Sequence, residues 1–508
     1  YSSAASDVYK RQISNTISKS ALNVFNIIVP LLIYPYIYRI FSANTVGKMD
    51  YATTIFTYFS LVGLLGIYNY GLREIARKRD IKEETNYIFK NLFVLGVISN
   101  IVVFIIYFLF VYYTINDSVL KKIMYVQGFG IIGQILYIEW INEAFEDYKF
   151  ITLKTIAIRV FSLCAVFLFI KNDGDYYKYV AITTATVVVN NIVSFVHIHK
   201  YVDLSFSKLC QNINIKPLII PLFTILILNN TNLLFTVADK TILGIYQPSE
   251  EVAFYGVGQK ISEMIRILFL SLVYVMIPRL SYYLENDFGA YKTGIKQMIR
   301  INFLLIAPVS IGLLALSKEI VLIFAGNQYA NAIPSMQLFA LRVFILSTEA
   351  IVYNQVIFLF RKEKFLMKAN ALCGLLNVVF DFTLCQCINS STAILTTLIC
   401  EGLFQIMCYI YIYKKLQLDI GLFKFANFKY IIISMLFIPT IWFVRSFELS
   451  ELLTVIVAVF SCMTIYILLL ILNKDSAANM IINKITIKNK KNETNLQRNC
   501  KSDSIWSH

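Results

Sequence analysis

Long apolar runs repeat along almost the whole chain, and no other feature limits its possible folds as strongly. About fourteen of these runs exceed the roughly 17 residues that a helix needs to cross a lipid bilayer. Only 15% of the residues are charged, whereas soluble domains carry about 25%. The sequence therefore predicts an all-α integral membrane protein. The predicted spans lie at 16–40, 50–72, 87–112, 119–140, 150–170, 177–198, 217–238, 252–277, 299–316, 331–352, 365–386, 390–413, 428–445 and 452–472.

A weak internal repeat divides the predicted spans into two halves. Val46 and Arg73 are separated by the same number of residues as Val252 and Arg279, and each Arg ends an even-numbered span. Two six-helix halves would have the same orientation, because six crossings return the chain to its starting side. We expect an N-lobe at 13–198, a C-lobe at 217–413, two further helices within 428–472, a basic cytoplasmic tail at 473–508 and a non-native stretch at 1–12.

The net charge of +15 is explained by the predicted topology. With the N-terminus on the cytoplasmic side, most Lys and Arg residues fall in cytoplasmic loops, as the positive-inside rule requires. The same count places both termini in the cytoplasm, and no nucleic-acid partner is needed to explain the basic charge. The clearest cytoplasmic loops lie at 73–82, 200–216, 361–368 and 414–429.

The nine cysteines and three histidines form no pattern typical of a metal site or a disulfide framework. Most of the cysteines lie in apolar spans, where they act as small core residues. Cys385 and Cys387 are two residues apart and point to different sides of a helix. There is no phosphate-binding glycine loop of the P-loop kind, and the non-cytoplasmic loops are short. We therefore expect no metal, no cofactor and no enzymatic activity.

Ionisable side chains within the predicted spans are the candidate functional residues, because such groups are costly in lipid and usually face a cavity or a partner. Helical spacing aligns Glu263 with Arg266, and Arg342 with Glu349. Structural ion pairs between packed helices are the alternative for any one of them. As a set they predict a central water-filled cavity. Its cations suit an anionic ligand and are Arg39, Arg159, Lys260, Arg266 and Arg342. Its acids are candidates for gating or ion coupling and are Asp239, Glu263, Glu349, Asp381 and Glu401.

Three groups of motifs carry a family resemblance. The first joins PYIYRIF at 35–41 to YGLREIA at 70–76, the second joins DKTILG at 239–244 to PRLS at 278–281, and the third begins with GLLN at 374–377. Over residues 13–472 the chain resembles the oligosaccharide flippases of the Wzx type, within the multidrug/oligosaccharidyl-lipid/polysaccharide exporter superfamily. Arg39 and Lys260 match basic positions of that family. Ala253, Asp381 and the turn at 389–392 depart from its pattern.

The resemblance implies a function and a location. It implies two six-helix lobes with two extra C-terminal helices, and alternating access in the bacterial cytoplasmic membrane. The implied cargo is an undecaprenyl-pyrophosphate-linked oligosaccharide repeat unit of an O-antigen, capsule or exopolysaccharide, moved from the inner to the outer leaflet. A polysaccharide polymerase and a chain-length regulator are the implied protein partners.

Three other functions stay open. They are a flippase for the peptidoglycan-precursor lipid, a small-molecule exporter of the same superfamily, and a non-transporting scaffold for a polysaccharide assembly complex. The cationic residues argue against an exporter of cationic drugs, and a scaffold would not need charges in a cavity.

Overall fold

The computed structural model describes residues 22, 24–205 and 213–475, and these residues form helices and connecting loops without any strand. This confirms the predicted all-α fold, which a bilayer favours because a helix satisfies its backbone hydrogen bonds internally. The predicted segments at 1–12 and beyond residue 475 lie outside the described residues. The lobe boundaries stay a prediction.

Eleven of the described helices are long and apolar enough to cross a membrane, so the predicted count of fourteen is not confirmed. The difference comes from three predicted spans. The first is represented by the shorter apolar helix Val24–Ile40, since residues 16–21 lie outside the description. The fourth is broken into α5 (Ser118–Gln134) and α6 (Glu139–Ala144), and the seventh into α10 (Lys216–Asn229) and α11 (Thr236–Tyr246).

The described chain divides into two compact units. Unit 1 comprises the described parts of Tyr1–Lys260, Phe324–Ser335 and Met367–Glu401, and unit 2 those of Ile261–Ile323, Met336–Leu366 and Gly402–His508. The remaining helices are α2 (Ala43–Leu64), α3 (Ile67–Lys78), α4 (Lys82–Thr114), α7 (Tyr148–Phe169), α8 (Tyr176–His197), α12 (Ser249–Asn286), α13 (Phe288–Ala315), α14 (Ser317–Phe324), α15 (Ile333–Ile351), α16 (Glu363–Thr383), α17 (Ser390–Lys415), α18 (Phe425–Met435), α19 (Phe437–Arg445) and α20 (Glu451–Leu472).

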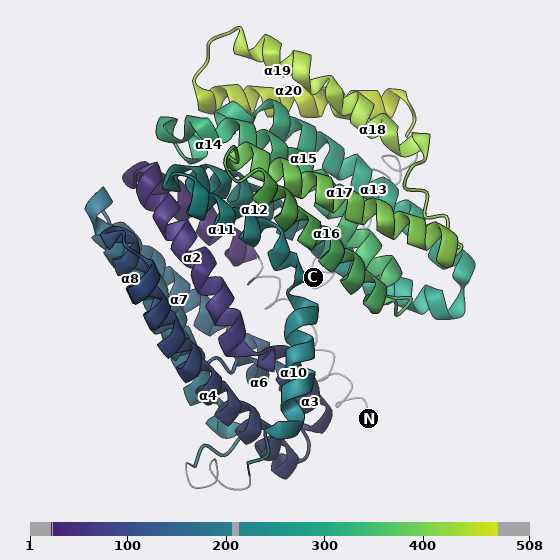
Figure 1. The fold of residues 1–508 in the computed structure, drawn as a ribbon. Helices are drawn as coiled ribbons and strands as arrows, with labels where there is room; N and C mark the ends of the chain where they lie inside the picture. Colours follow the sequence, from purple (N-terminus) through teal and green to yellow (C-terminus); the bar gives the residue numbers. More distant parts are fainter. Residues whose placement is uncertain (1–21, 23, 206–212, 476–508) are drawn as a thin grey trace, which may run out of the picture. The chain divides into compact units, whose positions relative to one another are not determined.

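Within unit 1, α7 packs against α8 (Figure 1), and α5 packs against α2, α4 and α8. Small residues allow this close packing, as is common between membrane helices. A Cβ on Gly133 would lie 2.5 Å from a methyl group of Val188, and one on Gly128 would meet the ring of Phe108 at 2.7 Å. Glycine residues on α5 therefore allow α4 and α8 to pack closely against this helix.

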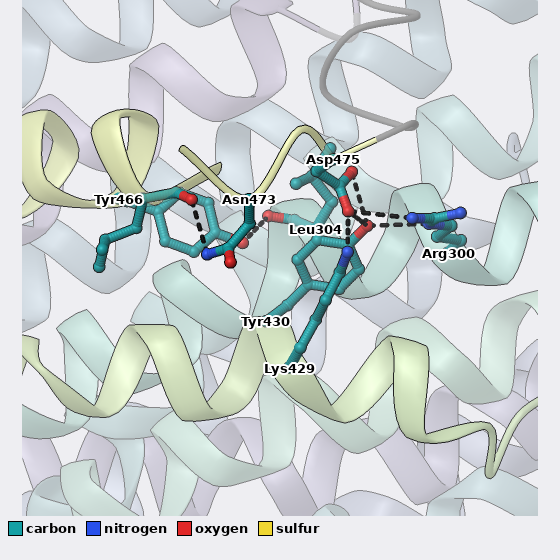
Figure 2. A network of polar contacts seen from close by, with 8 residues as sticks. Arg300, Leu304, Lys429, Tyr430, Tyr466, Asn473 and Asp475 are labelled. Carbon is teal, nitrogen blue, oxygen red and sulfur yellow. Dashed lines mark hydrogen bonds and ion pairs between the residues drawn. The ribbon is translucent and has the colours of Figure 1, made fainter. Parts of the chain in front are cut away.

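Within unit 2, the last helices are fixed to α13. Helices α18 and α19 pack on α13, and α19 packs beside α20 (Figure 1). The carboxylate of Asp475, just after α20, is fully buried and accepts hydrogen bonds from Arg300 on α13 at 2.9 Å and from Lys429 and Tyr430 on α18 (Figure 2). Arg445 on α19 also donates to both carboxylate oxygens of Glu319, at 2.6 and 2.7 Å.

Candidate functional site

Lys260, the cation expected from the sequence, lies in unit 1 within a polar and aromatic setting. Its ammonium group donates hydrogen bonds to both carboxylate oxygens of Asp50 at 2.9 Å and to the Tyr38 hydroxyl at 3.0 Å. It also lies 4.8 Å from the centre of the Tyr34 ring and 5.2 Å from that of Tyr38, within the range of cation–π attraction. The side chains of Lys260 and Asp50 are only 18% and 14% exposed. The pair joins α12 to α2.

The same two helices approach each other closely at their first turns. A Cβ on Gly47 would lie 1.7 Å from the carbonyl oxygen of Ser249, so only glycine allows this backbone contact. Asn44 donates to a carboxylate oxygen of Glu250 at 3.0 Å. We call this region the α2–α12 contact; it consists of Asn44, Gly47 and Asp50 on α2 and of Ser249, Glu250, Gly256 and Lys260 on α12.

A further segment of unit 1 supports the α2–α12 contact. Gln328 donates to the carbonyl oxygens of Tyr38 at 2.6 Å and Phe41 at 3.1 Å, and the Tyr329 hydroxyl donates to Phe41 at 3.0 Å. Both residues belong to the short helix Asn327–Ala332. Since Tyr38 and Phe41 are fully buried, this end of unit 1 is closed by backbone and side-chain contacts together.

Two of the predicted acids, Asp239 and Asp381, come together in the interior of unit 1. Both are fully buried, and they are close enough for the charge of Asp381 to act on that of Asp239. Asp239 accepts hydrogen bonds from Asn377 at 2.7 Å, Tyr255 at 2.6 Å and Thr397 at 2.5 Å. Two neighbouring buried carboxylates repel each other, so the pair is a candidate site for a proton or a cation.

Arg159, on α7, lies in a separate pocket of the first half, within unit 1. Its guanidinium group donates to the side-chain oxygen of Asn26. Glu139 lines the same pocket. It accepts from Lys154 and, at 2.9 Å, from Ser194. The structure thus places Arg159 and Lys260 in different settings, each with its own polar partners.

In unit 2, Arg342 lies near the predicted pair of Glu263 and Arg266. Arg266 forms an ion pair with Glu263, with Nε donating to one carboxylate oxygen at 2.7 Å. Arg342 is close enough for its charge to act on that of Arg266. It is 8% exposed, and its guanidinium lies 5.9 Å from the centre of the Phe339 ring. Glu349 lies near Tyr353.

The remaining predicted residues, Arg39 and Glu401, both lie in unit 1. Arg39 is exposed, although its neighbour Tyr38 is fully buried, and Glu401 is buried beside Cys400. Within the described residues, no group of three or more His, Cys, Asp or Glu side chains could hold a metal ion.

The sequence reasoning missed Asp50, the partner of Lys260. The second span was predicted to start at residue 50, which placed this acid at the edge of the membrane. In the structure α2 starts at Ala43, so Asp50 lies about two turns inside the helix. An acid two turns inside an apolar helix would have been recognised as a functional candidate.

These features define a multi-pass membrane protein with a polar interior, and the comparisons with known proteins identify its family. Residues 13–284, more than half of the chain, match the family model described as "Polysaccharide biosynthesis protein". The chain belongs to this family, which confirms the resemblance that its motifs indicate.

A curated relative and two solved structures extend this result. A protein of Escherichia coli (strain K12) named "Putative O-antigen transporter" is 22% identical over 77% of this chain and 94% of its own length. The structure titled "Lipid II flippase MurJ, inward closed conformation" matches with a TM-score of 0.69 at 15% identity, over 91% of this chain and 99% of that one. An inward-facing multidrug resistance MATE family transporter of the MOP superfamily matches with a TM-score of 0.54 at 11% identity, over 77% and 93%. Both structures share the fold.

Proposed function

We propose that this protein is a flippase, and not an enzyme, that moves undecaprenyl-pyrophosphate-linked oligosaccharide repeat units by alternating access. The movement runs from the inner to the outer leaflet of the bacterial cytoplasmic membrane, with both termini in the cytoplasm. Family membership and the O-antigen relative support the polysaccharide pathway. A polysaccharide polymerase and a chain-length regulator are the protein partners that this pathway suggests.

The pairing of Lys260 with Asp50 is the observation that most directly supports the proposal. A buried ammonium group needs a fixed negative partner, because desolvation without one is costly. Asp50 supplies that partner while the α2–α12 contact is closed. A pyrophosphate group could replace Asp50 on the same ammonium group, since phosphate oxygens accept charge-assisted hydrogen bonds as carboxylates do. Cargo binding would then release α2 from α12.

The orientation of the closed end follows from the proposed topology. With a cytoplasmic N-terminus, even-numbered spans begin on the outer side. Asn44 lies in the first turn of α2 and Glu250 in that of α12. Ser390, at the start of α17, donates its backbone N–H to Glu251. All three helices are even-numbered predicted spans, so these contacts would close the outer end and leave cargo to enter from the inner leaflet.

The other predicted residues have proposed roles consistent with this cycle. Arg39 would provide further positive charge for the pyrophosphate in unit 1. Within unit 2, Arg266 and Arg342 would form a separate cationic group, with Glu263 and Glu349 limiting its affinity for anions. The pair Asp239–Asp381 would bind the coupling proton or cation, and Glu401 lies in the same part of unit 1. Moving one charge across 100 mV is worth about 2.3 kcal/mol, which is enough to bias a two-state equilibrium about fiftyfold.

Reconstitution into liposomes tests this function. The lipid-linked oligosaccharide is built into both leaflets, and a membrane-impermeant glycosidase measures how fast protected glycan reaches the outer leaflet. We expect rapid flipping that responds to ionophores and needs no ATP. No flipping under any gradient would contradict the proposal.

A competition assay distinguishes this function from that of a flippase for the peptidoglycan-precursor lipid. Excess undecaprenyl-pyrophosphate-linked oligosaccharide should slow the flipping of labelled cargo, whereas lipid II should compete weakly. Stronger inhibition by lipid II would assign the protein to the peptidoglycan precursor instead. Normal polysaccharide export by a variant that flips neither lipid would identify a scaffold.

A further inference from the structure

The first half of the chain contains a pocket that the pairing of Lys260 and Asp50 does not use. It has a volume of about 450 Å³ and lies entirely within unit 1. This volume falls in the range of about 300–1,000 Å³ that is usual for small-molecule sites. Its lining residues lie on the first helix, on α2, α5, α6, α7 and α8, and in the loop that joins α5 to α6.

Two broken helices build this pocket. The helix pair α2 and α3 is interrupted at Leu65 and Gly66, which both have positive φ values, of 48° and 74°. The pair α5 and α6 is interrupted between Gln134 and Glu139, and both of these residues line the pocket. In membrane transporters, interrupted helices are common where a ligand binds, because a break exposes polar groups that an intact helix would hide. A left-handed conformation at Leu65 is also unfavourable without a local reason.

The lining is rich in groups that both donate and accept hydrogen bonds. Gln134 donates to Ser60, but its buried side-chain oxygen has no hydrogen-bond partner among the residues that the structure describes. Thr155 and Asn190 line the pocket as well. Asn191 is fixed by its donation to the carbonyl oxygen of Gly133 at 3.0 Å. A buried acceptor without a partner is unfavourable, so a turn of the Gln134 side chain toward a ligand hydroxyl in the pocket would supply the missing hydrogen bond.

The charges of the pocket favour a neutral ligand. Arg159 and Glu139 contribute one charge of each sign to its lining. Glu139 is fixed by Lys154 and by Ser194, so its carboxylate stays in place. Because Lys154 already balances Glu139, only the single charge of Arg159 is left to compensate a ligand, which is too little for a buried pyrophosphate. A hydroxyl group can instead accept from a guanidinium group and donate to a carboxylate or an amide oxygen.

We propose that this pocket binds one neutral sugar ring of the lipid-linked glycan. The inference rests on the proposed flippase function and deepens it, since it separates sugar recognition at Arg159, Glu139 and Gln134 from pyrophosphate binding at Lys260. Sugar specificity then resides in the first half of the chain.

Equilibrium binding to the full chain in lipid nanodiscs tests the proposal without any transport step. The probes are methyl α-glucoside and methyl N-acetyl-α-glucosaminide as neutral sugars, and inorganic pyrophosphate as the anion. Saturation-transfer NMR reports binding of the two glycosides, and calorimetry reports binding of pyrophosphate. We expect at least one glycoside to bind and pyrophosphate not to displace it.

Substitutions assign the binding to the pocket. Asn190→Leu and the conservative Thr155→Val should each weaken glycoside binding by about three- to tenfold, which corresponds to one lost neutral hydrogen bond. The matched control is Asn354→Leu. Asn354 lies in unit 2, away from the pocket residues, and its amide donates to the carbonyl oxygen of Ala350, so this variant should bind normally. Equal binding by Asn190→Leu, Thr155→Val and Asn354→Leu would overturn the proposal, as would the absence of binding by both glycosides.

A third variant separates this inference from the proposed function. Lys260→Gln should lose pyrophosphate binding and keep glycoside binding. Displacement of the glycoside by pyrophosphate would show that the pocket holds the anion, and would overturn the inference. A protein that binds glycosides in the pocket but flips no lipid-linked glycan would refute the flippase function alone.

Discussion

At the scale of single residues, Lys260 combines two roles that are usually separate. Its ion pair with Asp50 is mostly shielded from solvent, so removing either partner leaves the other without compensation. The hydroxyl of Tyr38 and the rings of Tyr34 and Tyr38 add weaker contacts. A residue that only fixed the helices would need no net charge, whereas a residue that exchanges Asp50 for pyrophosphate must be a cation.

Substitution of Lys260 distinguishes these roles. Lys260→Gln should reduce surface polysaccharide, normalised to the amount of protein in the membrane, by at least about tenfold, because a charge-assisted hydrogen bond is worth about 1.5–3 kcal/mol. Lys260→Arg should retain more export, since it keeps the charge. Lys48→Gln is the matched control, because Lys48 pairs with the more exposed Asp117 at 2.7 Å. Near-normal export by Lys260→Gln would remove Lys260 from the substrate site.

A second prediction concerns the loop residue Asp147. Burial opposes its charged form, but hydrogen bonds from His197 at 2.9 Å, from Lys200 and from Tyr201 at 2.9 Å outweigh this effect and hold the pKa of Asp147 well below its usual range. A lowered pKa in the folded state stabilises the protein above the unfolded-state pKa of about 3.9, and this contribution is lost as the pH falls through the folded-state value.

Thermal unfolding in detergent checks this prediction. At neutral pH, Asp147→Asn should be less stable than the wild type by about 1–3 kcal/mol. The difference should shrink as the pH falls below about 4, because the carboxyl group then takes up a proton in the unfolded wild type while it stays charged in the folded protein, and the difference should vanish only below the folded-state pKa. A difference that stayed constant with pH would contradict the ionic origin of this contribution.

At the scale of helices, hydropathy predicts the ends of some elements well and others poorly. The spans expected at 150–170 and 452–472 correspond closely to α7 and α20. The span expected at 119–140 is broken after Gln134, where the chain lines a polar pocket. Hydropathy averaged over a window of residues does not reveal such a local break. The span expected to end at 277 continues through Pro278 to Asn286, since proline is tolerated in membrane helices where neighbouring groups satisfy the freed carbonyl.

The attachment of the last helix gives a prediction at this scale. Asp475→Asn leaves Arg300 and Lys429 without their shared carboxylate, so we expect a loss of about 3–5 kcal/mol in the stability of unit 2 (Figure 2). The matched control is Asp419→Asn. Asp419 is 49% exposed and pairs with Lys296 at 3.1 Å, so its loss should cost less than about 1 kcal/mol.

Limited proteolysis of the purified chain, combined with thermal unfolding, measures this difference. Asp475→Asn should expose new cleavage sites near α18 and α20 at temperatures where the control is resistant. Equal resistance of the two variants would show that apolar packing alone holds these helices in place.

At the scale of the whole molecule, the sequence predicted the class of fold and several members of the site, but not their grouping. Polar stripes on separate helices indicated one cavity. The structure instead gathers Asp239 with Asp381, Lys260 with Asp50, and Arg266 with Arg342, while Arg159 lines a pocket of its own. Helical spacing fixes which residues share a face, but it carries no information on which helices face each other or where a helix breaks.

In the proposed transport cycle, the α2–α12 contact opens each time that cargo is moved. Asn44 and Glu250 lie on its two sides, with their side chains 3.0 Å apart. In a background without the native cysteines, Asn44→Cys and Glu250→Cys can be joined by a short bifunctional methanethiosulfonate reagent, whose disulfide links to the two cysteines are cleaved by reduction. The measurement is the flipping rate of lipid-linked oligosaccharide in proteoliposomes, before and after cross-linking and after reduction, with each single-cysteine variant as a control. Cross-linking should stop flipping and reduction should restore it, while the single variants should be unaffected. A cross-linked protein that flips its cargo at the normal rate would contradict the proposed cycle.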